Sequence, residues 1–247
     1  MKLSLILCSL VILYFFSNLS YADEVLVYRH ETMPWCGTVD GRDAGVTVDI
    51  LEQITLHGGP SFRYKSVPWP RAQKMVHTTK GSLIIPLTRT AAREPYYTWI
   101  VSLVPNQIRL TLFDEFARSE SPKSNLSLAQ IKTMSVGVIQ GSSIIPELEE
   151  TGFKSIYEAD DIEQLIGLLV KKRLAAMVES KLVDTYQWQK LGYDKKSLIA
   201  GPNVGGVGYI YLGAGLDFPP EMTKKIRLAM DKIKANGVYD EILSRWY

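Results

Sequence analysis

The chain has 247 residues, of which 46% are hydrophobic and 22% are charged, and its formal net charge is +2. These proportions are typical of a globular protein, and the length accommodates one large domain or two modest lobes. The small net charge and the scattered basic residues give no electrostatic case for nucleic-acid binding, so that class of partner is excluded.

The N-terminus has the pattern of an export signal. Lys2 precedes an apolar run at 3–16, which is too short to span a bilayer comfortably. Ser20-Tyr21-Ala22 then places small residues where a signal peptidase needs them. We therefore expect residues 1–22 to be a signal peptide cleaved after Ala22, so that the mature chain begins at Asp23. An uncleaved membrane anchor is the alternative.

Cysteine and histidine residues give no sign of a disulfide or a metal. Cys8 lies inside the apolar leader, so Cys36 is the only cysteine of the mature chain and cannot form an internal disulfide. We expect Cys36 to be a buried, inert thiol. His30, His57 and His77 lack the spacing of metal ligands. We expect neither a metal nor a cofactor.

The first half of the mature chain alternates strand-like and helix-like segments. Gly58 and Gly59 end the first helical pattern, and Pro70 suits the first position of the second helix. The apolar periodicity predicts, in order, a strand at 25–28, a helix beginning near 45–53, a strand at 62–67 and a helix at 71–78.

The next stretch reads SLIIPLTRTAARE. Its apolar run at 83–85 predicts a buried strand broken by Pro86, and residues 91–94 predict the start of a helix. A strand that ends in a polar turn at a helix N-terminus collects free backbone N–H groups, which is where small anions bind in open α/β folds. Thr88 offers a hydroxyl and Arg93 a bidentate guanidinium, so the stretch suits a carboxylate. An ordinary strand–turn–helix with a surface arginine is the alternative.

A second α/β set follows. Asp160 or Asp161 can cap its longer helix, and the four glycines and the proline at 201–208 predict a flexible connection. The predicted strands lie at 108–113, 135–139, 175–178 and 209–212, and the predicted helices at 145–150, 162–169, 222–233 and 238–246.

Two α/β sets joined by two crossings predict an α/β fold of two lobes, each a mixed sheet flanked by helices. We place lobe 1 at 23–104 and 209–247 and lobe 2 at 108–203, with hinge segments near 104–108 and 203–209. Two linkers between lobes make a hinge, and the cleft between the lobes is the expected ligand site.

Four segments resemble the periplasmic solute-binding proteins of family 3, the polar amino-acid type that serves ABC importers. GVTVDILEQI is similar to the family's Gly-aromatic-acid signature, and TRTAARE to its Thr-x-Thr-x-x-Arg carboxylate motif. SVGVIQGSS resembles the strand and hydroxyl-bearing turn that open the second lobe, and IKANGVYDEILSRWY resembles the C-terminal helix pair. The resemblance covers the mature chain and implies a type II periplasmic-binding-protein-like fold.

The resemblance also implies a set of ligand-binding residues. Arg93 matches the arginine that clamps a carboxylate, and Thr88 matches its hydroxyl partner. Ser142 and Ser143 match the second-lobe turn that closes on the same carboxylate. The aromatic cleft walls are expected at Trp35 and Trp69, although core packing is an equal alternative for both tryptophans.

The chain departs from the family pattern at two positions. The signature's first acidic position is Thr47, which leaves Asp49 as its only acid. The family places an aspartate for the ligand's ammonium group just after the second-lobe strand, where this chain has Glu179 and Ser180. Either Glu179 takes over that role, or the ligand lacks a conventional α-ammonium group, or Glu179 is a solvated surface residue.

The function implied by the resemblance is that of a monomeric periplasmic protein that captures a small carboxylate-bearing ligand and delivers it to an ABC permease in the inner membrane. An enzyme of the cyclohexadienyl-dehydratase type is an alternative, with Glu179 as the candidate acid. A sensor that signals to a membrane receptor is another. No nucleophile–base pair is recognisable in the sequence, which favours a binding protein over an enzyme.

Overall fold

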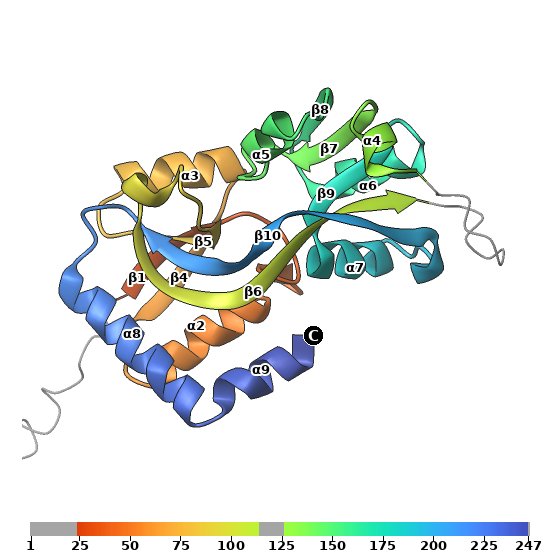
Figure 1. Cartoon of the computed structure of the whole chain (residues 1–247). Helices are drawn as coiled ribbons and strands as arrows, with labels where there is room; N and C mark the ends of the chain where they lie inside the picture. The colour runs from red at the N-terminus through yellow and green to blue at the C-terminus, as the bar shows by residue number, and fades with distance from the viewer. Residues whose placement is uncertain (1–23, 114–125, 247) are drawn as a thin grey trace, which may run out of the picture.

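The computed structural model describes residues 24–113 and 126–246, apart from the side chains of residues 206 and 207 (Figure 1). The predicted signal peptide and its cleavage site after Ala22 lie outside the described residues. None of the helices in the described part of the chain combines the length and the apolar character that crossing a bilayer requires.

The eight longer strands that the structure describes form one mixed sheet in the order β4-β1-β5-β10-β6-β9-β7-β8. β1 is parallel to β4 and β5, and β7 is parallel to β8 and β9, whereas β6 and β10 run antiparallel to each other and to their outer neighbours. The bounds are β1 Glu24–Arg29, β4 Ser61–Ser66, β5 Leu83–Thr88, β6 Thr98–Phe113, β7 Ser135–Ile139, β8 Ser155–Ala159, β9 Ala176–Ser180 and β10 Leu198–Ala214.

The two long central strands connect two halves of the molecule. β6 carries the chain from the first half into the second, and β10 brings it back beside β6 (Figure 1). The segments expected to act as hinges are paired within this ladder, with Asn106 opposite Gly208. Their role as hinges stays a prediction.

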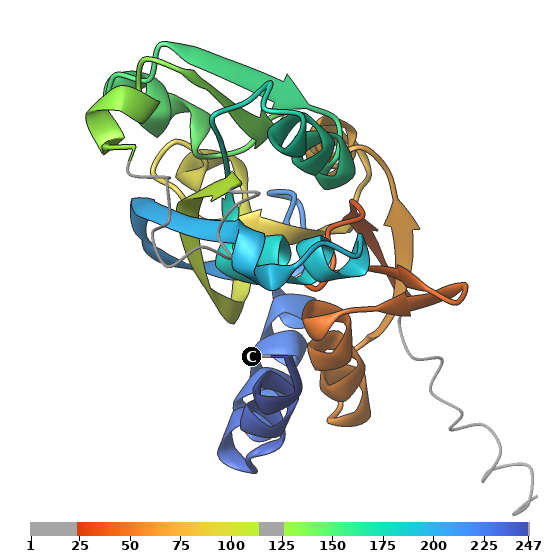
Figure 2. The same cartoon turned by 90° about the vertical axis from the view of Figure 1, so that its right-hand side faces the viewer.

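Helices complete each half, and a hairpin is added to the first half. α2, α8 and α9 contact one another at one end of the first half (Figures 1 and 2). The bounds are α2 Val46–Leu56, α3 Trp69–Thr78, α4 Leu128–Ile131, α5 Ile145–Glu150, α6 Ile162–Val170, α7 Lys181–Lys190, α8 Pro220–Ala235 and α9 Val238–Trp246, with the hairpin β2 Gly37–Val39 and β3 Arg42–Ala44 and the 3-10 turns η1 Glu94–Tyr96 and η2 Lys195–Ser197.

The helices cover the sheet because each buries one apolar stripe. In α2 the side chains of Val46, Ile50 and Ile54 recur every four residues and are all fully buried. They belong to the larger apolar cluster, which extends from the first half to Trp188 in α7. A smaller cluster fills the second half between β7, β9 and α5 and includes Leu148.

The expected break at Pro86 is wrong, because β5 continues through this residue to Thr88. Pro86 lacks an N–H group, so it is tolerated in a sheet only where the hydrogen-bond ladder does not need that donor. The register of β5 with β10 is irregular between Tyr211 and Gly213, next to this point, and β1 pairs with β5 only up to Ile84.

The expected helix at 91–94 is also wrong. The chain forms turns there and then the short 3-10 turn η1. Pro95 explains the difference, since a proline has no N–H group and disfavours helical backbone at the residue before it. Arg93 therefore lies on a turn after β5 and not in an α-helix.

Residues 201–208 were expected to be a flexible connection but lie within β10. The neighbouring strand β6 supplies hydrogen-bond partners along this segment, with register shifts between Ala200 and Asn203 and again before Val207. The glycines allow the strand to bend where the pairing is irregular. β8 and α7 were not predicted from the sequence.

We predict that Asp161→Ala lowers the free energy of unfolding by about 1 kcal/mol, because the Asp161 carboxylate accepts a hydrogen bond from the Gln164 N–H group at 2.8 Å and so caps α6. Asp161→Asn is the matched control, since asparagine caps equally well. Urea denaturation of the three proteins measures the effect. Equal stability of the alanine variant and the wild type would contradict it.

Candidate functional site

One cavity between the two halves is lined by all seven side chains that were predicted to bind a ligand. Its volume is about 60 Å³, and it is also lined by His30, Thr32 and Asn106. The predicted residues found at this cavity are Thr88, Arg93, Trp35 and Trp69 from the first half, and Ser142, Ser143 and Glu179 from the second. Their role in binding a ligand stays a prediction.

The cavity lies where strands from both halves end. β1 and β5 are parallel, so their carboxyl ends lie at the same edge of the sheet, and His30 and Thr88 lie there. In the second half, β7 ends at Ile139 and is followed by the turn that contains Ser142 and Ser143. Ligands of open α/β folds bind at this kind of edge.

Arg93 is the cation of this cavity, and protein acceptors hold its guanidinium. Nη1 donates to the Thr88 carbonyl at 3.2 Å, and Nη2 donates to Gln73 Oε1 at 3.0 Å and to the Gly141 carbonyl at 3.2 Å. The guanidinium also lies 5.8 Å from the centroid of the Trp69 ring. Burial lowers the pKa of Arg93, but an arginine remains charged.

The Gly141 contact joins the two halves, because Arg93 and Gln73 belong to the first half and Gly141 to the second. Gln73 Nε2 also approaches the Gly141 carbonyl, at 3.4 Å. Gly141 has a φ of +71°, and an added Cβ there would lie 3.1 Å from Gln73 Nε2. A second contact between the halves runs from Gln187 Nε2 to the Met33 carbonyl at 3.1 Å. The described halves are thus in contact across the cleft.

Glu179 supplies the carboxyl group of the cavity. It lies in β9, and its Oε1 accepts a hydrogen bond from the Ser180 N–H group at 2.7 Å. Burial raises its pKa to about 7, so the carboxyl is partly protonated at neutral pH. Asp184 in α7 is fully buried nearby, where it accepts from the Thr111 hydroxyl and lies 3.7 Å from Arg109 Nε. Burial and the neighbouring Glu179 carboxylate raise the pKa of Asp184 as well.

His30 is a cavity residue that sequence analysis missed. Its ring centroid lies 5.0 Å from that of Trp69, and burial lowers its pKa to about 4. The imidazole is therefore neutral at physiological pH. Within the described residues its buried Nδ1 atom has no hydrogen-bond partner, and neither does Asn106 Oδ1. Both atoms lie in residues that line the cavity. The position of His30 directly after β1 is the signal that could have identified it.

The two tryptophans are at once core residues and cavity walls. Trp35 is 3% exposed and Trp69 is 5% exposed, and both belong to the larger apolar cluster. Both also line the cavity. The two alternatives left open by the sequence therefore do not exclude each other.

The structure shows no metal centre in the part of the chain it describes, since no three histidine, cysteine or acidic side chains cluster there. Cys36 is a buried free thiol whose pKa burial raises to about 12, and it donates to the His30 carbonyl at 3.4 Å. A protonated thiol of this kind is a poor nucleophile.

A larger cavity of about 680 Å³ shares Trp35 and Asn106 with the first but includes none of the other six predicted residues. Specific sites combine apolar walls with a few convergent polar groups. The smaller cavity has a partly buried guanidinium, a partly buried carboxyl group and the hydroxyl groups of two threonines from the first half and two serines from the second. We therefore take the smaller cavity as the candidate functional site.

No protein-family model matches the sequence, and no curated protein matches it significantly. Solved structures match the fold over almost the whole chain. A mutant of ArgBP from T. maritima superposes with a TM-score of 0.77 at 15% sequence identity, covering 93% of this chain and 97% of its own. A histidine kinase sensor domain with similarity to periplasmic binding proteins gives a TM-score of 0.78 at 12% identity, covering 92% and 96%.

A third match is an ancestral amino acid-binding protein that is a precursor of cyclohexadienyl dehydratase, with a TM-score of 0.75 at 15% identity, covering 91% of this chain and 95% of its own. At these identities the similarity establishes the fold. The chain has the type II periplasmic-binding-protein-like fold, and the predicted fold class is confirmed.

We predict a pH effect on stability from His30. Its pKa is lowered in the folded state, so between pH 6.5 and 4 the unfolded chain binds a proton that the folded chain does not. The stability of the wild type relative to His30→Gln therefore falls as the pH is lowered, by up to about 3 kcal/mol near pH 4. Denaturant unfolding at several pH values measures this difference, and a difference independent of pH would contradict it.

Proposed function

We propose that this chain is a solute-binding protein of the polar amino-acid type, which captures a small carboxylate-bearing ligand between its two halves. The observation that carries the proposal is the partly buried Arg93 guanidinium, which lines a cavity together with Ser142 and Ser143 of the other half. A guanidinium presents paired N–H groups that match a carboxylate, and the serine turn adds hydroxyl and backbone donors.

The proposed mechanism is closure of the two halves on the ligand. The carboxylate first binds to Arg93 and Thr88 of the first half. The turn of the second half that contains Ser142 and Ser143 then adds further hydrogen bonds to the same carboxylate. Only contacts that are stronger in the closed state can shift the balance toward closure. The segments 104–108 and 203–209, in which β6 and β10 pass between the halves, are the proposed hinges.

Glu179 faces the other end of the ligand in this proposal. It takes the place of the family's aspartate, and its carboxyl group lines the same cavity as Arg93. Because its pKa is near 7, ionisation of Glu179 depends on what binds beside it. A ligand with an ammonium group favours the carboxylate form, whereas a plain acid favours the protonated form.

We further propose that the protein is a periplasmic monomer that delivers its ligand to an ABC permease. Its fold is shared by a binding protein for arginine and by a sensor domain of a histidine kinase, so signalling to a membrane receptor is the competing role. The genes beside this one distinguish the two roles. A permease and an ATPase support transport, and a histidine kinase or a cyclase supports sensing.

A dehydratase is the second candidate function, and one observation favours it. Glu179 is a largely buried carboxylic acid with a pKa near 7, the property that a general acid requires. Loss of water from prephenate or arogenate, followed by absorbance, tests this function. We expect no turnover, and turnover that disappears in Glu179→Gln would replace the binding role with a catalytic one.

We predict that a thermal-shift screen of carboxylates, amino acids and small peptides finds a ligand, and that Arg93→Ala abolishes its binding with the fold intact. A ligand at 100 times its Kd adds about 2.7 kcal/mol to stability, which raises the Tm of a chain this long by about 5–10 °C. Calorimetry measures the affinity, and circular dichroism verifies the fold.

Arg89→Ala is the matched control for this substitution. Arg89 lies four residues earlier and forms an exposed ion pair with Glu94 at 2.5 Å, and it does not line the cavity. We expect its affinity to stay within about twofold of the wild type, because exposed ion pairs contribute little. Wild-type affinity in Arg93→Ala, or equal losses in both variants, would refute the assigned site.

The pH dependence of affinity gives a further prediction from Glu179. A ligand with an ammonium group binds more tightly as the pH rises from 6 to 8, since Glu179 then becomes ionised. A plain carboxylate binds less tightly over the same range. Calorimetry should show either dependence in the wild type and a flat profile in Glu179→Gln. A dependence that persists in this variant would show that another group is responsible.

A further inference from the structure

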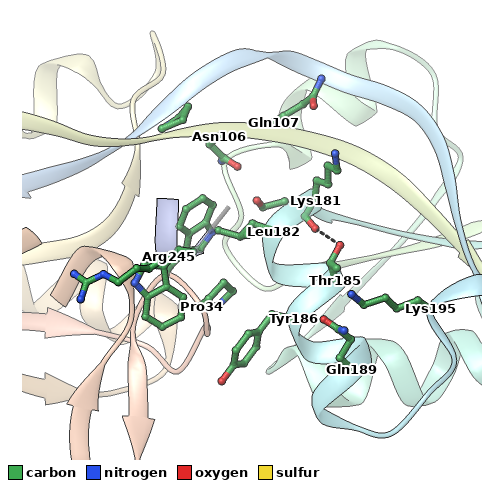
Figure 3. Close-up of a pocket in the computed structure, with 14 residues that line it drawn as sticks. Pro34, Asn106, Gln107, Lys181, Leu182, Thr185, Tyr186, Gln189, Lys195 and Arg245 are labelled. Carbon is green, nitrogen blue, oxygen red and sulfur yellow. Dashed lines mark hydrogen bonds between the residues drawn. The ribbon is translucent and has the colours of Figure 1, made fainter. Parts of the chain in front are cut away.

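The cavity of about 680 Å³ lies between elements of both halves (Figure 3). Pro34 and Trp35 form one side, the β6 crossing at Pro105–Gln107 another, and α7 a third. The end of α9 contributes Arg245 and Trp246. The volume of this cavity falls within the range of about 300–1,000 Å³ that small-molecule sites occupy.

The charged side chains around this cavity have one sign. Lys181, Lys195 and Arg245 line it, and the described lining residues include no aspartate or glutamate. Arg245 Nη2 lies 3.8 Å from Asp49 Oδ2, so this carboxylate already compensates part of the charge of Arg245. The two lysines come from α7 and η2, and Figure 3 shows them on the same side of the cavity. The cavity therefore favours an anion.

The walls between these cations include apolar and aromatic side chains. Trp35, Leu182 and Tyr186 line the cavity together with Trp246. Trp246 is held in place because its Nε1 donates to Asp49 Oδ2 at 2.9 Å. Flat apolar walls beside cations suit an anion attached to a planar apolar group.

Asn106 is a buried polar group at this cavity. It is 7% exposed, and its Oδ1 atom has no hydrogen-bond partner among the described residues. Figure 3 shows its side chain extending from β6 into the cavity. An unpaired buried carbonyl oxygen is costly, and a ligand that donates a hydrogen bond would satisfy it.

We propose that this cavity is a second binding site, which takes a small organic anion with a planar apolar group. The site is separate from the carboxylate site at Arg93, with which it shares Trp35 and Asn106. Its walls come from both halves of the molecule. The affinity of this cavity for its ligand therefore depends on the relative position of the two halves. Binding of a ligand in either cavity then changes the affinity of the other cavity for its own ligand.

Titration with 1-anilinonaphthalene-8-sulfonate tests the second site. This probe is a sulfonate on a planar naphthalene ring, and its fluorescence increases in apolar surroundings. We expect saturable binding of one equivalent, and an affinity at least about tenfold weaker in the double variant Lys181→Glu/Lys195→Glu, which reverses two of the cations. Tyr186→Ala should also weaken binding, since it removes part of the aromatic wall.

The matched control is Lys190→Glu/Lys196→Glu. It makes the same change of charge on the same two elements, at positions that do not line the cavity. Lys190 Nζ lies 3.5 Å from Glu163 Oε1 in an exposed ion pair, which contributes little to stability. We expect this control to bind the probe within about twofold of the wild type. Arg93→Ala is measured alongside to detect a probe bound in the carboxylate site.

Three outcomes would overturn the proposal: no saturable binding by the wild type, equal losses in both double variants, or a loss confined to Arg93→Ala. The last would place the probe in the carboxylate site. The proposed function is tested separately, because a failure at the lysines leaves the Arg93 experiment unaffected.

Discussion

The partly buried guanidinium of Arg93 is the constraint on which the site depends. A charge removed from water needs hydrogen-bond acceptors, and here the acceptors are the Thr88 carbonyl, Gln73 and the Gly141 carbonyl. Because Gly141 belongs to the other half, the same charge that would hold a ligand also holds the halves together. The carboxylate of a ligand competes with these protein acceptors for the N–H groups of Arg93. Ligand binding and closure of the two halves therefore both change the hydrogen bonds of this one side chain.

The strand pair β6–β10 makes this arrangement possible. It is the one connection in the central sheet that passes from one half to the other, within the residues that the structure describes. The register of the ladder shifts on either side of Asn203, and again after Ile210 and after Leu212 on the first-half side. Asn106 lies at this crossing and lines both cavities, so a change in the angle between the halves alters both sites together.

Much of the fold was accessible from local sequence patterns. Apolar periodicity located β1, β7 and α5, and the cap of α6 was correctly narrowed to Asp160 or Asp161, of which Asp161 is the cap. The elements that were not predicted from the sequence have weak apolar periodicity. β8 is an edge strand with mostly exposed side chains, and α7 buries polar residues such as Asp184. Residues 201–208 join the sheet only because β6 supplies partners, which no local pattern reveals.

The local pattern singled out Thr88 and Arg93, and the resemblance supplied the other predicted site residues. His30 was missed, although its position just after the first predicted strand places it at the same edge of the sheet. The most direct test of the site is a crystal structure of the protein with a ligand from the thermal-shift screen. We expect both carboxylate oxygens within hydrogen-bond distance of the Arg93 guanidinium, with Ser142 or Ser143 contacting the same group. A ligand bound elsewhere, with Arg93 still on the Gly141 carbonyl, would contradict the assignment.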